Sequence, residues 1–129
     1  MTDKFEVSNE YLHNLVLAQV QQMDGPAYDE ERDGCVYRYP DGSPGCIVGR
    51  LMSDYKPLVE GTHVGCEDTL ACLPFKLSGR QVDYLMQVQK IHDASGVDRG
   101  DVGAWRADVS DAIRAVAIRE LKLGVIPHA

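Results

Sequence analysis

Residues 78–95, SGRQVDYLMQVQKIHDAS, predict an amphipathic helix whose inward face contains two polar side chains. Ser78 followed three residues later by Gln81 is a capping-box pattern, in which each side chain bonds the other residue's backbone N–H. The polar pair is Gln89 and His92. Because an unpaired buried polar group costs about 1–3 kcal/mol, we expect both residues to be structural and to tie this helix to a neighbouring hairpin. The expected inward face consists of Val82, Leu85, Met86, Gln89 and His92.

Two more helices are predicted, at residues 8–23 and at about 102–123. Apolar residues recur at spacings of three and four in both segments, which is the helical period. Ser8 is suited to cap the first helix, residues 98–101 form a loop that caps the last one, and Gly124 is a suitable stop. The expected apolar stripes are Leu12, Leu15, Val16, Gln19 and Met23 in the first, and Trp105, Val109, Ala112, Ile113, Val116, Ala117 and Leu121 in the last.

A β-hairpin is predicted between the first two helices. Residues 35–39 (CVYRY) and 46–52 (CIVGRLM) are β-prone and flank a turn rich in Pro, Asp and Gly. Alternation would place Cys35, Tyr37 and Tyr39 on one face. The turn is too long to fix the register, so the pairing of Cys35 with Cys46 stays open.

These elements predict an α+β protein, in which a β-hairpin or small antiparallel sheet packs against three amphipathic helices in a single domain, residues 1–129. The longest uncharged apolar stretch, residues 70–75, is far shorter than a membrane span, and residues 1–11 lack the apolar core of a secretory signal. We therefore expect a cytoplasmic protein that does not engage membranes. The 20 acidic and 13 basic residues give a net charge of −7, which disfavours direct nucleic-acid binding.

The cysteines leave a metal site open as an alternative. In a reducing cytoplasm the thiols at positions 35, 46, 66 and 72 are expected to be free. Cys35, Cys46, His63 and Cys66 could together bind zinc, and His63 and Cys66 have an H-x-x-C spacing. Structural zinc sites normally show two closely spaced ligand pairs, and this chain has one. The main prediction is accordingly no cofactor.

A cysteine nucleophile is the second alternative. Cys46 could act with His92 as its base, because such chemistry needs a thiolate in contact with an imidazole. Asp93 follows His92 directly, about 100° around the helix axis, and is not expected to orient the same imidazole. A buried, unreactive Cys46 is the favoured interpretation, and the protein is more easily explained as a non-enzyme.

Several short motifs resemble a pattern of small phage and prophage proteins. They are C-x-Y-R at residues 35–38, D-G at 41–42, C-x-V-G at 46–49 and Q-x-x-H-D at 89–93. Arg50 departs from the pattern, where a small residue or cysteine is expected. The resemblance implies a phage-borne accessory protein, and it implies neither a reaction nor a ligand.

An acidic run beside several tyrosines suggests how such a protein would act. The acidic residues complement a basic partner, and tyrosine is a favoured interface anchor. We expect stoichiometric binding to a host or defence protein with a basic surface, as an inhibitor or modulator in the cytoplasm of the infected bacterium. The expected contact residues are Tyr28, Asp29, Glu30, Glu31, Asp33, Tyr37, Arg38 and Tyr39.

Overall fold

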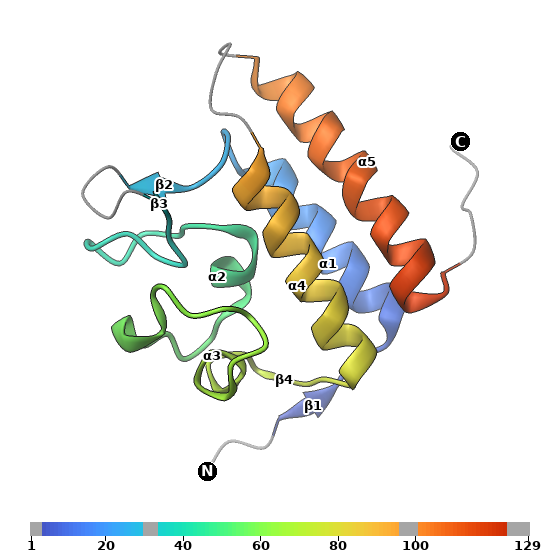
Figure 1. Ribbon diagram of the computed structural model, residues 1–129, viewed down its shortest axis with the longest axis horizontal. Helices are drawn as coiled ribbons and strands as arrows, with labels where there is room; N and C mark the ends of the chain where they lie inside the picture. The colour runs from blue at the N-terminus through green and yellow to red at the C-terminus, as the bar shows by residue number, and fades with distance from the viewer. Residues whose placement is uncertain (1–3, 30–33, 96–100, 124–129) are drawn as a thin grey trace.

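Three long helices lie side by side in the computed structural model of the protein (Figure 1). They are α1 (Asn9–Gln22), α4 (Gly79–Ala94) and α5 (Val102–Leu121). Helix α5 packs against both α4 and α1. The structure describes residues 4–29, 34–95 and 101–123. All three predicted helices are confirmed, with bounds within two residues of those expected.

Each long helix begins at a side chain that satisfies one of its free backbone N–H groups. The Ser8 hydroxyl accepts from the N–H of Tyr11 at 3.1 Å, and the Asp101 carboxylate accepts from Ala104 at 3.0 Å. Ser78 and Gln81 form the predicted capping box, with reciprocal bonds of 3.2 and 2.9 Å. At the other end of α5, Lys122 follows the last helical residue and has a left-handed backbone conformation, with φ 56°. The predicted stop at Gly124 lies outside the described residues.

The buried face of α4 differs from the predicted one. Helix α5 and helix α2 (Ile47–Leu51) both pack against α4, so α4 is covered from two directions. Tyr84 and Val88 are fully buried, whereas Met86 and Gln89 are only half-buried. The stripe is therefore rotated around the helix relative to the prediction, and it consists of Gln81, Tyr84, Leu85, Val88 and His92.

The predicted hairpin at residues 35–52 is wrong, because its second arm is helix α2. The turn does close, with the N–H of Tyr39 donating to Ser43 O at 3.1 Å and an isolated bridge between Arg38 and Pro44. Backbone pairing ends at Cys46, whose sulfur then caps α2 by accepting from Gly49 at 3.5 Å. A short, fully buried apolar run has no periodicity that distinguishes a strand from a helix, which explains the error.

Glycine allows α2 to lie directly against residues 36–37. A Cβ atom on Gly49 would lie 2.0 Å from the carbonyl oxygen of Tyr37, and one on Gly45 would lie 2.4 Å from that of Val36. The Cys46 N–H donates to Val36 O at 2.9 Å across this contact. Both Val36 and Tyr37 are buried, so the expected alternation of faces does not occur.

The strands are short and belong to two separate pairs. β1 (Phe5–Glu6) runs parallel to β4 (Phe75–Lys76), and β2 (Tyr28–Asp29) runs antiparallel to β3 (Gly34–Cys35). In the β2–β3 pair, Cys35 lies opposite Tyr28 and not opposite Cys46. A 3-10 turn at Pro57–Val59 and helix α3 (Glu67–Ala71) complete the described elements. The protein is thus α+β, but predominantly helical.

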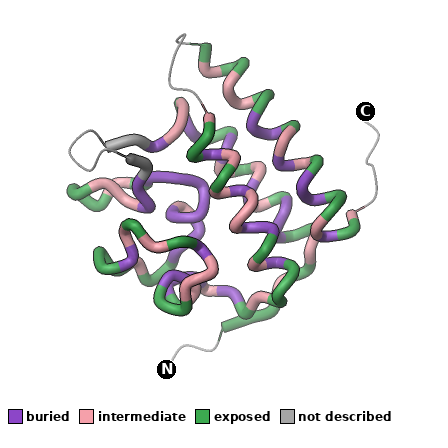
Figure 2. Tube along the Cα trace, in the orientation of Figure 1, coloured by how far each residue is buried: buried purple, intermediate pink, exposed green. Residues whose placement is uncertain are grey.

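Buried residues gather where the inner faces of the long helices meet α2 and the chain around residues 36–37 (Figure 2). Helix α2 is buried along almost its whole length and lies against α1 and α4. The resulting core fixes the position of α4 relative to residues 36–62, and the candidate site lies at this junction. None of the helices in the described parts of the chain is both long and apolar enough to cross a bilayer.

Candidate functional site

His92 is fully buried on α4 and is bonded through both ring nitrogens. Its Nε2 accepts from the backbone N–H of Ala27 at 2.9 Å. The proton of the neutral ring is therefore on Nδ1, which donates to Oδ1 of Asp93 at 3.0 Å. The expectation that Asp93 could not orient this imidazole is wrong, because the carboxylate reaches back to the ring from the adjacent position.

Gln89 supplies the second donor to the same carboxylate. Its Nε2 donates to Oδ1 of Asp93 at 2.8 Å, one helical turn away. The other end of the amide, Oε1, is buried and has no hydrogen-bond partner among the described groups. Asp93 is thereby held by two donors while its side chain remains 49% exposed. This arrangement fixes a carboxylate in one position at the protein surface.

Glu60 organises the chain that faces this carboxylate. Its two oxygens accept from the backbone N–H groups of Tyr37 and Arg38, each at 2.9 Å, and from the hydroxyl of Tyr55 at 2.6 Å. The Tyr37 hydroxyl donates to Thr62 O at 2.6 Å, and burial raises its pKa well above the ordinary value of 10, so that it stays protonated. Sequence reasoning missed Glu60, since an isolated glutamate in a weakly patterned segment gives no signal.

These groups border a cavity of about 290 Å³ between α4 and residues 60–64, which we call the α4 pocket. Its buried wall includes Tyr37 and Val64, and its rim includes His63, Lys90 and Asp93. The pocket therefore combines an apolar interior with charged groups at its entrance. Such a combination suits a ligand with an apolar stem and a polar end.

The predicted contact surface is not assembled as expected. Tyr37 is only 5% exposed, so it does not form the exposed aromatic anchor that was expected; it lines the α4 pocket instead. Arg38 is half-buried, with a guanidinium nitrogen donating to Met52 O at 2.9 Å and its charge 5.4 Å from the Tyr55 ring centre. Tyr39 lines a different cavity. Glu30, Glu31 and Asp33 lie outside the described residues, and of Tyr28 and Asp29 only the backbone is described.

In the part of the chain that the structure describes, the residues considered for a zinc site and for a cysteine nucleophile form neither a metal site nor a reactive thiol. Cys46 is fully buried, and burial raises the pKa of its thiol to about 12. Both nitrogens of the His92 ring are already bonded to other groups. Cys66 is half-buried, and no three described His, Cys, Asp or Glu side chains lie together as metal ligands. For Cys35 only the backbone is described.

Comparison with protein-family models, curated proteins and solved structures gave no significant match to this chain. The fold and the site define a small α+β protein with a pocket beside a fixed carboxylate.

Proposed function

We propose that this protein acts by stoichiometric binding of a basic partner protein, a host or defence component of a phage-infected bacterium, as an inhibitor or modulator. In this proposal the α4 pocket receives a lysine or arginine side chain of the partner. The observation that carries the proposal is the Asp93 carboxylate, which two donors hold in place while half of the side chain faces solvent.

A fixed carboxylate favours binding because it loses little conformational entropy when it pairs with a cation. Tyr37 and Met86 line the pocket and would contact the aliphatic stem of a lysine or arginine. Lys90 stands on the same rim and opposes a cation, so removal of its charge is expected to strengthen binding.

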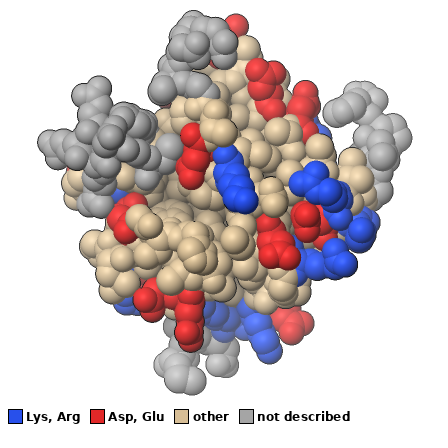
Figure 3. Space-filling model, in the orientation of Figure 1, with Lys and Arg blue, Asp and Glu red and all other residues tan. Residues whose placement is uncertain are grey.

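The net charge of the whole chain also supports a basic partner. The net charge of −7 favours encounter with a positive surface. On the face shown in Figure 3, however, acidic and basic side chains are interspersed. On this face, local recognition in a pocket therefore explains binding better than a single-sign patch. The resemblance to phage proteins supports the setting in which the partner is sought.

Affinity capture from bacterial lysate tests the proposal. Immobilised wild type is compared with Asp93→Asn. The asparagine oxygen can still accept the hydrogen bonds from Gln89 and His92, but the side chain carries no charge. Asp83→Asn is the matched control, an exposed carboxylate on the same helix that lies outside the pocket. We expect wild type and Asp83→Asn to retain the same basic protein in a 1:1 ratio, and Asp93→Asn to lose it. Equal retention by all three, or retention of acidic proteins alone, contradicts the proposal.

A further inference from the structure

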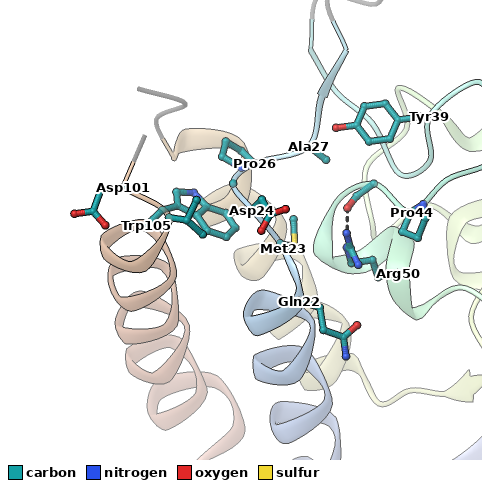
Figure 4. Close-up of a pocket in the computed structure, with 13 residues that line it drawn as sticks. Gln22, Met23, Asp24, Pro26, Ala27, Tyr39, Pro44, Arg50, Asp101 and Trp105 are labelled. Carbon is teal, nitrogen blue, oxygen red and sulfur yellow. Dashed lines mark hydrogen bonds between the residues drawn. The ribbon is translucent and has the colours of Figure 1, made fainter. Parts of the chain in front are cut away.

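A second cavity, of about 310 Å³, lies between the end of α1, the start of α5 and residues 39–50 (Figure 4). We call it the Trp105 pocket. It shares no lining residue with the α4 pocket. Trp105 borders it on the α5 side, and Tyr39 and Pro44 border it on the opposite side. Its volume is within the range of small-molecule sites.

Arg50 gives this pocket a cation without a carboxylate partner among the described residues. Its side chain is half-buried and extends from α2 toward the end of α1, with Nε donating to Gly45 O at 3.1 Å. That bond leaves the two terminal nitrogens of the guanidinium available.

Two carboxylates also line the pocket, and both are engaged elsewhere. Asp24 pairs with the guanidinium of Arg106 at 3.2 Å, and its side chain is 90% exposed. Asp101 caps α5 by accepting from the N–H of Ala104 at 3.0 Å. Neither bond leads to Arg50. Arg50 is therefore the cation in this lining with which an incoming anion would pair.

Trp105 lines the pocket with its indole ring. Its indole Nε1 is buried and has no acceptor among the described groups, whereas a buried indole N–H normally finds one. Trp105 belongs to the apolar stripe expected for the last helix, but in the structure this residue is only half-buried. Its ring lies across the side of the pocket near Met23 and Asp24.

We infer that the Trp105 pocket binds a small planar anion, namely an aromatic or heteroaromatic ring that carries a phosphate or a carboxylate. The planar guanidinium of Arg50 matches the two oxygens of either anionic group. Trp105 and Pro44 line the pocket on opposite sides and supply apolar surface for the ring. This site is separate from the one proposed for the protein partner, and it does not depend on that proposal.

Ligand titrations test the inference, and the single tryptophan of the chain provides the signal. The probes are adenosine monophosphate, adenosine, benzoate and inorganic phosphate, each followed by Trp fluorescence and by calorimetry. We expect adenosine monophosphate or benzoate to bind at least about tenfold more tightly than both adenosine and phosphate, since ring and anion act together. The inference is overturned if no probe binds, or if adenosine or inorganic phosphate binds as tightly as adenosine monophosphate and benzoate do.

Two variants locate the site. Arg50→Gln should weaken binding about tenfold or more, whereas Arg80→Gln, an exposed arginine of α4 outside the pocket, should leave it unchanged. Trp105→Phe, in which Arg50 is unsubstituted, should weaken binding as well, and calorimetry measures its affinity. Unchanged affinity in both Arg50→Gln and Trp105→Phe excludes this pocket. Asp93→Asn should have no effect, which separates this outcome from that of the protein-binding proposal.

Discussion

The backbone N–H of Ala27 donates a 2.9 Å hydrogen bond to Nε2 of His92, 65 residues further along the chain. This bond joins the segment after α1 to the last turn of α4. It also fixes the tautomer, since the proton must then be on Nδ1, which donates to Asp93. The imidazole therefore has two roles: it connects two parts of the core, and it orients the carboxylate that we propose contacts the partner.

Replacement of His92 by leucine should lower the stability of the protein. Leucine fills a similar space but leaves the buried N–H of Ala27 without an acceptor, which costs about 1–3 kcal/mol. Urea unfolding at pH 7.5 measures the effect, with the exposed Asp83→Asn variant as the control. A loss of free energy of unfolding no larger than that of the control would show that the bond contributes nothing.

Replacement of Gly49 by alanine should be strongly destabilising, although alanine is the better helix former. The new Cβ would lie 2.0 Å from the carbonyl oxygen of Tyr37, so the backbone must move. We expect the free energy of unfolding to fall by about 2 kcal/mol or more. A Cβ atom added to Gly79, the first residue of α4, would meet nothing within 4 Å, and Gly79→Ala should leave stability unchanged or raise it by up to about 1 kcal/mol. Similar losses in the two variants would refute the close approach of α2 to residue 37.

The Cys46 thiol should be unreactive in the folded protein. Burial raises its pKa to about 12 from 9.0, which lowers the thiolate fraction at neutral pH by about a thousandfold. In native buffer, a thiol-reactive probe read by mass spectrometry should modify the half-buried Cys66 well before Cys46. Both should react at comparable rates in denaturant. Rapid modification of Cys46 in the native state would restore the nucleophile hypothesis.

The stability of the protein should decrease as pH falls through the range in which free histidine titrates. Burial, assisted by the nearby Arg114 guanidinium, lowers the pKa of His13 from 6.5, and its Nδ1 lies 2.7 Å from the Tyr84 hydroxyl. The unfolded chain therefore takes up the proton first, and stability is lost below about pH 6.5 until the folded-state pKa is passed. Urea unfolding between pH 7.5 and 5.0 should show a smaller decline in His13→Gln. Equal slopes in wild type and variant would contradict this assignment.

The three long helices were predictable because their signals are local. Helical periodicity and capping side chains operate within one or two turns, so Ser8 and Ser78 mark the starts of their helices without knowledge of the rest of the fold. The face that α4 buries was not predictable in the same way. It depends on which elements pack against α4, and the packing of α2 on one side and α5 on the other rotates the buried stripe.

The error at residues 46–52 has a tertiary cause. Ile47 and Val48 favour strands by composition, but the contact with residues 36–37 requires glycine at positions 45 and 49 and accommodates a short helix. The candidate site was only partly visible for the same reason. Gln89 and His92 attracted notice as polar residues on an apolar face, whereas Glu60 acquires its role only when the fold brings it to the backbone of Tyr37 and Arg38.

The affinity of the purified partner for variants of the α4 pocket tests the proposed function most directly. Isothermal titration calorimetry of the complex should give a 1:1 ratio. Asp93→Asn should raise Kd by about tenfold or more, as expected when one member of a desolvated charge pair is removed. Lys90→Gln should lower Kd, and Asp83→Asn should change it by less than about twofold. If Asp93→Asn and Asp83→Asn give the same Kd as wild type, the partner does not bind at the α4 pocket and the proposed function is contradicted.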